Sequence, residues 1–296
     1  MVWDKDRGDE LRRDRRRSAA AIFSIWTSIP AIALAAFAAA TGPGLADTGT
    51  ASHPCLVPKT TGLPVELSDS NTLTFTAKNG HQFYLADVLF VPAHEHASDV
   101  PAPLKDADEQ FQAIPAGPVD RWNMRPAWIV VASADGSGMA TLQEDLIGQG
   151  KAVVVPWHAT DICSQQLLKV ESTARHRQVG RWKTEKPRST AIPEALVEQA
   201  GSHAIAQGRI VSLGKTDSTR YLNFGWYWKR DLTAVISRQD ESRFAKALQA
   251  RGHRLEDLAG KAVRVRGVVE LRDGPLIRLT HPGQLEVLDS QGNERE

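Results

Sequence analysis

The sequence predicts an α+β fold that is mainly β and consists of two small β-barrels. The first observation is a polar–apolar alternation typical of half-buried strands, which runs over Asn71–Thr76 and returns over Gln82–Ala86. The pair Asn79-Gly80 between them is a common hairpin turn. The second observation is a group of short alternating runs after Gly201. With 296 residues, the chain is long enough for two domains with separate cores.

Residues 1–46 have the composition of an export signal. A charged segment that ends in Arg15-Arg16-Arg17 precedes an alanine-rich apolar run from Ala19 to Ala40, and Gly44-Leu45-Ala46 offers small residues for cleavage. The apolar run is nearly long enough to span a membrane, so an uncleaved N-terminal anchor stays an alternative. Both interpretations place the remaining chain outside the cytoplasm. The sequence therefore predicts a periplasmic or secreted protein without stable membrane association once the signal is removed.

Changes in composition suggest six segments. These are the signal (1–46), an irregular lead-in (47–64), a first domain (65–182), a linker (183–200), a second domain (201–288) and a tail (289–296). Residues 47–200 carry 13 basic and 18 acidic groups, whereas residues 201–296 carry 16 and 12. Because proteins bind polyanions chiefly by neutralising phosphates, the second domain is the better candidate for binding nucleic acid.

Cys55 and Cys163 are the only two cysteines. An even number of cysteines in an exported protein is commonly paired, so we predict a disulfide; two separate buried thiols are the alternative. The bridge would tie the start of the mature chain to the loop before a helix, and would stabilise the fold by ~3–5 kcal/mol in the chain-entropy model.

The middle of the chain predicts a strand and several helices. A short helix is expected over Leu104–Ala113, and an apolar strand over Ala127–Ala132. A helix over Leu142–Gln149 then leads through Gly150 into a β-rich strand over Lys151–Pro156. A second helix begins at Gln165 and ends at Gly180, a typical C-cap, after which Trp182 can turn back onto the core.

This order resembles the C-terminal half of a thermonuclease-like (staphylococcal nuclease-like) domain. The landmarks are Gly-Lys-Ala-Val, the cysteine, Leu-Leu, Glu171, Ala174-Arg175 and Gly-Arg-Trp, and the resemblance covers about Asp69 to Trp182. It implies that the first barrel is an OB-fold of staphylococcal nuclease type. It also implies a family chemistry of phosphodiester cleavage, with calcium on acidic oxygen ligands, a glutamate that activates water, and two arginines on the phosphate. An unrelated α+β core is the alternative.

Several catalytic positions of that family are changed in this chain. Asp69-Ser70-Asn71 stands where the family has Asp-Gly-Asp, so Asp69 and Asn71 could hold calcium only weakly. The first arginine aligns with Tyr84, the general base with Ala93, and the second arginine with Met124. Losing one charge donor typically costs ~10²–10³-fold in rate. The sequence therefore predicts a degenerate site with no cofactor, and calcium only if nuclease activity survives.

Three nearby residues are possible substitutes. The alignment between Tyr84 and Pro92 differs from the family by one residue, so Glu95 or Asp87 could take the place of the base. Arg125 follows Met124, but a one-residue shift turns a strand side chain to the opposite face.

A histidine cluster offers a different chemistry. His94-Glu95-His96, with His81 and Asp99 nearby, has the residue types of a zinc site. It lies in a polar loop, where an exposed histidine pair is the commoner outcome.

The second domain has the element order of an OB-fold, namely five strands with a helix after the third. The runs Tyr221–Gly225, Val263–Gly267 and His281–Val287 resemble the OB-like module appended to thermonuclease-like domains in exported bacterial proteins. The expected strands cover 206–213, 220–224, 232–236, 262–269 and 276–279, with the helix over 243–249.

Aromatic and basic residues cluster between the second and third of these strands. Such groups can stack bases and hold the backbone of a single strand. Arg264 and Arg266 share one face of a strand and could bind a phosphate or be solvated, and Arg278 could join them. Alternatively, Tyr221 and Phe224 belong to the core and the tryptophans cap the barrel end. The candidate ligand-binding residues are Trp226, Trp228, Lys229, Arg230, Arg264 and Arg266.

The sequence thus favours an exported thermonuclease-family protein with a degenerate catalytic site that binds nucleic acid or an envelope ligand. Two alternatives stay open. One is an active calcium-dependent nuclease, and the other is a structural or adaptor protein that binds polypeptide. The expected partners are single-stranded nucleic acid or an envelope protein.

Overall fold

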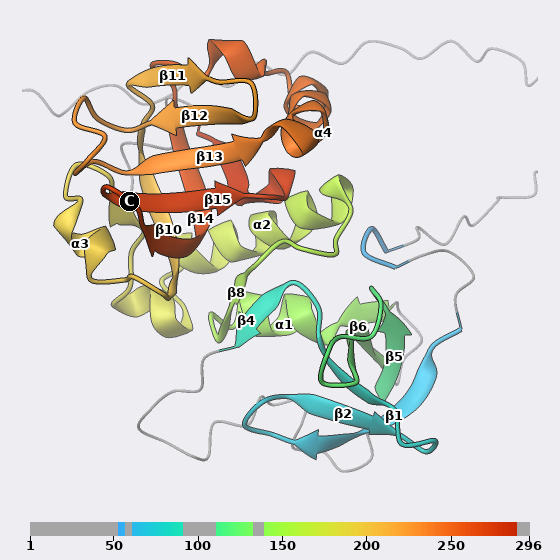
Figure 1. Cartoon of the computed structure of the whole chain (residues 1–296). Coiled ribbons are helices and arrows are strands. Elements are labelled where there is room, and N and C mark those ends of the chain that lie inside the picture. Colours follow the sequence, from blue (N-terminus) through green and yellow to red (C-terminus); the bar gives the residue numbers. More distant parts are fainter. Residues whose placement is uncertain (1–52, 57–60, 91–110, 133–138, 289–296) are drawn as a thin grey trace, which may run out of the picture. The chain divides into compact units, whose positions relative to one another are not determined.

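The computed structural model describes residues 53–56, 61–90, 111–132 and 139–288, which all belong to one contact unit, Thr50–Glu296 (Figure 1). The predicted export signal and the predicted tail lie outside the described residues. None of the described helices is both long and apolar enough to cross a membrane. The described part is mainly β with few helices, which confirms the predicted fold class at this level.

Five strands of the first half form a closed β-barrel. They are hydrogen-bonded in the order β3-β2-β1-β5-β6, and a parallel pairing of β3 with β6 closes the barrel. Alternate apolar side chains fill its interior, where the rings of Phe75 and Phe111 pack edge to face with centroids 5.4 Å apart. The predicted hairpin is present, with Gly80 at φ 82° in its turn. The strands are β1 (Leu63–Asp69), β2 (Thr74–Ala77), β3 (Gln82–Leu85), β5 (Phe111–Pro115) and β6 (Met124–Ala132), and β7 (Met139–Thr141) extends the sheet at β6.

One predicted element is wrong in part. Residues 111–113 do not end a helix but belong to β5, where Phe111 pairs with Val131 and Ala113 with Ile129 of β6. The side chains of Phe111 and Ala113 are buried in the barrel. Pairing with the distant strand β6 therefore decides the backbone conformation of this segment. The rest of that predicted helix lies outside the described residues.

Two helices and a short two-stranded sheet share the core of the first barrel. Their threonine N-caps are Thr141 and Thr160, which accept from the backbone N–H groups of Glu144 and Cys163. Leu146 and Leu167 are fully buried between them. These elements are β4 (Val88–Phe90), α1 (Leu142–Gly148), β8 (Ala152–Val154), α2 (Asp161–His176) and the 3₁₀ helix η2 (Gly180–Lys183).

Gly150 and Gly180 let two chain segments approach closely. Both have a left-handed backbone, with φ of 65° and 57°. A Cβ on Gly150 would lie 2.1 Å from the carbonyl oxygen of Val179, and one on Gly180 would lie 2.4 Å from that of Gln149. Only glycine fits at both positions, which explains the two glycines that sequence analysis places at element ends.

The predicted disulfide is confirmed. Cys55 and Cys163 are bonded, with Cα atoms 4.6 Å apart, and both are buried. The bond joins the described start of the chain to the first turn of α2.

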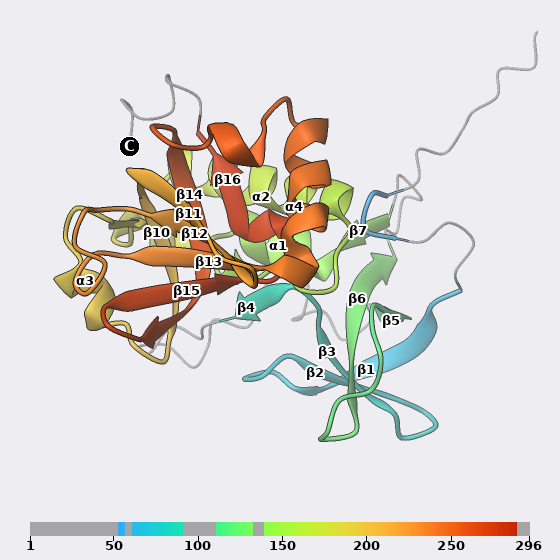
Figure 2. The ribbon, with the colours of Figure 1, turned by 45° about the horizontal axis from the view of Figure 1, so that its top comes forward.

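The second half forms a half-barrel whose strand order is that of an OB-like barrel. The order is β11-β12-β13-β15-β14-β10, with β13 and β15 parallel, and β10 leads directly into β11. The helix after the third strand is present as α4, which lies beside the ends of β12 and β13 (Figure 2). The elements are β10 (His203–Arg209), β11 (Ser212–Lys215), β12 (Thr219–Asn223), β13 (Thr233–Ser237), α4 (Arg238–Ala250), η3 (Leu255–Asp257), β14 (Ala262–Leu271), β15 (Pro275–Leu279), η4 (Pro282–Gln284) and β16 (Leu285–Val287).

The segment between the barrels is structured. The strand β9 (Arg188–Ser189) adds to the edge of β10 in parallel, and the short helix α3 (Glu194–Val197) follows. The two barrels have separate hydrophobic cores.

Candidate functional site

Tyr84 and Met124, which stand where the thermonuclease resemblance places two arginines, lie on one face of the first barrel. The register pairs Gln82 with Met124 and Phe83 with Arg125. Because side chains alternate along a strand, Arg125 projects to the opposite side from Tyr84. Burial and, after it, the charges of nearby aspartates raise the pKa of Tyr84, so its phenol is neutral at pH 7. This face therefore offers no cation from these two strand positions.

In the turn 69–72, the carboxylate of Asp69 is engaged in hydrogen bonds within the turn and does not form an open metal site. The carboxylate of Asp69 accepts from the backbone N–H of Asn71 and from the hydroxyl of Thr72, both at 2.8 Å. The hydrogen bond from Thr72 and that from Asn71 keep the pKa of Asp69 below its usual value. Among the described residues, no group of three or more His, Cys, Asp or Glu side chains could hold a metal ion.

Asp87 has a structural role. It has φ 59°, and its buried carboxylate accepts three backbone N–H groups, from Trp157 at 3.1 Å and from His158 and Ala159 at 2.7 Å. Both oxygens are thus engaged in fixing the loop that leads to α2, and no lone carboxylate is presented to a substrate. Ala93, Glu95 and the histidine pair around Glu95 lie outside the described residues.

The loop between β12 and β13, Gly225–Asp231, carries three exposed aromatic side chains. Trp226 is 78% exposed, Tyr227 73% and Trp228 58%, whereas Phe224 just before them is buried in the core. The tryptophans therefore do not cap the barrel. Large aromatic side chains that stay in water are unusual and commonly mark a binding surface.

This aromatic loop is held by its own hydrogen bonds. Asp231 is central: its backbone N–H donates to the carbonyl of Tyr227 at 2.7 Å, and its carboxylate accepts from the N–H of Tyr227 at 2.9 Å. A Cβ on Gly225 would lie 1.9 Å from that carboxylate, so glycine is required. The loop thus presents its aromatic side chains on an ordered backbone, which lowers the entropy lost when a ligand binds.

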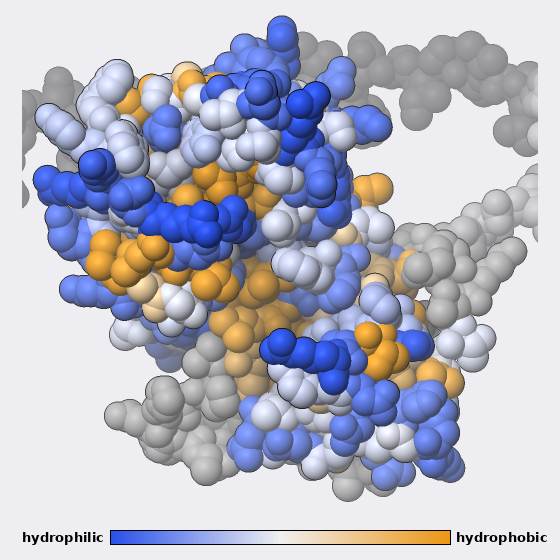
Figure 3. All heavy atoms as spheres, viewed as in Figure 1, coloured by the Kyte–Doolittle hydropathy of each residue, from blue (hydrophilic) through white to orange (hydrophobic). Residues whose placement is uncertain are grey.

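Basic groups and the turn between β14 and β15 border the aromatic loop. The Lys229 ammonium lies 5.3 Å from the ring centroid of Trp228, and Arg230 forms an exposed ion pair with Glu194 of α3 at 3.1 Å. Gly274 in the turn packs against the backbone of Trp228, where a Cβ would lie 2.9 Å from the carbonyl oxygen. In OB-folds the loop between strands four and five borders the ligand face. Apolar surface also gathers beside α3 (Figure 3).

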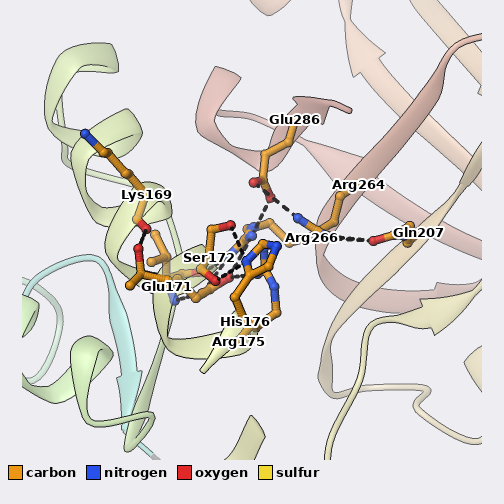
Figure 4. A network of polar contacts seen from close by, with 11 residues as sticks. Lys169, Glu171, Ser172, Arg175, His176, Gln207, Arg264, Arg266 and Glu286 are labelled. Carbon is orange, nitrogen blue, oxygen red and sulfur yellow. Dashed lines mark hydrogen bonds and ion pairs between the residues drawn. The ribbon is translucent and has the colours of Figure 1, made fainter. Parts of the chain in front are cut away.

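Arg264 and Arg266 do not contribute to this surface, which corrects the expectation that they form an accessible pair. Arg266 is fully buried and Arg264 is 4% exposed, and their guanidinium groups contact side chains from α2, β10 and β16 (Figure 4). Arg264 donates twice to Gln207, at 2.6 and 3.0 Å. Arg278, by contrast, is half-exposed and bonded to Glu270 at 2.9 Å.

Glu171 of α2 is the centre of the buried polar network that joins the two barrels. Its carboxylate accepts from Arg266 at 2.9 and 3.0 Å, from Arg175 at 2.6 Å, and from the N–H of Val154 at 2.8 Å. Burial alone would raise the pKa of Glu171, but the guanidinium of Arg266 and these other donors hold it below its usual value. Arg266 also donates to Glu286 at 2.5 Å. These contacts link α2 to β14 and β16 of the second barrel.

The environment of His203, which lies beside this network, predicts that the stability of the fold decreases in acid. Burial and then the charge of Arg266 lower its pKa from 6.5 to about 4, so the folded state binds its proton less readily than the unfolded state. Its contribution to stability is complete above pH 6.5 and is lost as the pH falls towards 4, at about 1.4 kcal/mol per pKa unit. We expect His203→Gln to lose less stability than the parent between pH 7 and pH 4 in urea unfolding. An unchanged pH profile would contradict this.

Comparison of the sequence with protein-family models and with curated proteins finds no match. The class of the protein is given by its fold. It is a mainly β protein with a closed five-stranded barrel and an OB-like half-barrel.

No pattern in the sequence singles out Gly225 and Asp231, which order the aromatic loop. The available signal is local: an aspartate four residues after an aromatic residue can accept a backbone N–H across a tight loop. The partnership of Glu171 with Arg266 is also missed, since it joins residues 95 positions apart.

Proposed function

We propose that this protein is a non-catalytic member of the thermonuclease-like class and that its second barrel binds single-stranded nucleic acid. The observation that carries the proposal is the aromatic loop, which holds Trp226, Tyr227 and Trp228 in water on an ordered backbone. Base–aromatic stacking contributes about 1–3 kcal/mol per base and tolerates any sequence.

Phosphate contacts would come from the basic groups beside the loop. Lys229 and Arg230 are adjacent to the tryptophans, and Arg272 lies exposed in the bordering turn. The ion pair between Arg230 and Glu194 is exposed on both sides, so breaking it costs at most about 1 kcal/mol. Arg230 can therefore exchange its partner for a phosphate.

Three features of the first barrel support the absence of catalysis. Tyr84 and Met124 supply no positive charge, Arg125 lies on the other face, and the carboxylate of Asp87 is consumed by backbone N–H groups. We also propose a periplasmic or secreted location, because the buried Cys55–Cys163 disulfide fits an oxidising compartment.

Truncation of the exposed tryptophans tests the proposal. We expect Trp226→Ala and Trp228→Ala each to weaken binding of labelled oligothymidylate about 5–150-fold, the equivalent of 1–3 kcal/mol per stacked base. Lys229→Ala should instead flatten the salt dependence by about 0.7 in log–log slope. Fluorescence anisotropy at two salt concentrations measures both effects.

Matched controls are available in the first barrel. Trp122 and Trp157 are 65% and 63% exposed, and their alanine variants should bind as the parent does. Equal losses in all four tryptophan variants would indicate non-specific binding. No binding at low salt by a folded protein would contradict the proposal and favour a polypeptide-binding adaptor, and calcium-dependent cleavage would contradict the absence of catalysis.

A further inference from the structure

Two hollows are lined in part by the connector 182–189. One of about 340 Å³ is lined by the end of α2 and by β10, and one of about 400 Å³ is lined by β4, β8, α3 and β10. Both volumes fall in the range of small-ligand pockets. The larger hollow is lined by apolar and by basic side chains, and none of its lining residues belongs to the aromatic loop.

Part of the lining of the larger hollow is apolar, and this part is called its floor below. It includes Leu89 of β4, Val153 of β8, Ile205 of β10 and Ile192 before α3. Leu89 is 39% exposed and Ile192 is 56% exposed. Figure 3 shows apolar surface in this part of the molecule, next to β4 and β8. An apolar tail that covered these side chains would remove them from water, which is favourable.

The lining is positively charged. It contains Arg181, Lys186 and Arg188 but, among its residues, only one acid, Glu185. Arg181 already donates twice to Glu185, at 3.0 and 2.7 Å, so these two charges compensate each other. Lys186 and Arg188 are exposed, and no ion pair within the described residues engages them. An anionic head group is therefore the complementary partner.

We propose that this hollow binds an amphiphilic anion, with a carboxylate or phosphate head on Lys186 and Arg188 and an unbranched aliphatic tail on the floor formed by Leu89 and Ile192. The combination distinguishes the ligand from two simpler classes. A small inorganic anion would leave the apolar floor exposed to water. A neutral apolar compound would leave Lys186 and Arg188 without an anionic partner. The inference is independent of nucleic-acid binding, because none of its residues lies in the aromatic loop.

Calorimetric titration of the full chain with decanoate and decyl phosphate tests the site, and the two arms distinguish a carboxylate head from a phosphate head. We expect saturable binding of one of them below its micellar concentration. Acetate, inorganic phosphate and decyltrimethylammonium should bind at least tenfold more weakly, because each lacks either the tail or the negative charge.

Two pairs of variants place the ligand in the hollow. Lys186→Glu with Arg188→Glu should weaken decanoate binding at least tenfold, whereas Lys246→Glu with Arg254→Glu makes the same charge change on exposed residues outside the hollow. Ile192→Glu should block the floor, whereas Ile162→Glu, at a residue 73% exposed on α2, should not. The inference is overturned by equal affinity for the cationic amphiphile, by equal affinity for acetate, by the absence of saturable binding, or by equal effects of the paired variants.

Discussion

We expect that replacing Arg266 with methionine will lower the free energy of unfolding by about 3–5 kcal/mol, the typical cost of removing one partner from a buried ion pair. The side chain is fully buried and donates to both oxygens of Glu171 and to Glu286. Without it, the carboxylate of Glu171 keeps Arg175 and the N–H of Val154 but loses its strongest compensating charge. Urea unfolding followed by tryptophan fluorescence measures the loss.

An exposed ion pair gives the matched control. Arg278 donates to Glu270 at 2.9 Å, but its side chain is 47% exposed, so Arg278→Met should cost less than about 1 kcal/mol. Arg266→Lys keeps the charge without the planar fork, and its cost should fall between those of the two methionine variants. A cost below about 1 kcal/mol for Arg266→Met would show that the network does not hold the barrels together.

Removing the disulfide has an effect of similar size. Cys55 and Cys163 are separated by 108 residues, and the chain-entropy model gives about 4–5 kcal/mol for a loop of that length. We expect the double variant Cys55→Ser, Cys163→Ser to unfold at correspondingly lower urea concentration.

The bond itself is checked by mass spectrometry. The intact protein should gain two hydrogens on reduction, and non-reducing alkylation should modify neither cysteine. Reductant should lower the stability of the parent protein but leave that of the double variant unchanged. Ready alkylation without reductant would contradict the bonded state.

The features that could be predicted from the sequence depend on local residue patterns or on the even number of cysteines. Val263 and Val265 alternate with polar residues as a strand requires, and both lie in the core of the second barrel. The disulfide follows from two cysteines in a chain whose first 46 residues predict an export signal. Gly150 and Gly180 mark element ends because their backbone conformations are closed to other residues.

The features that could not be predicted depend on distant parts of the chain. Arg264 and Arg266 have the alternation of a solvent-facing strand, yet both are buried, and α2 and β16 supply the acids that pair with them. Phe111 lies in a segment with helical composition but pairs with Val131 of β6. The exposure of Trp226 and Trp228 is likewise set by tertiary structure, since aromatic composition alone fits a core as well as a surface.

The partnership of Glu171 with Arg266 has a consequence for the order in which the chain can fold. During synthesis, α2 emerges before β14, and the arginine that neutralises its buried glutamate follows 95 residues later. A nascent chain that ends before β14 would have to leave that carboxylate hydrated or protonate it. We therefore expect the first barrel to remain open to proteases until the last strands of the second barrel have been made.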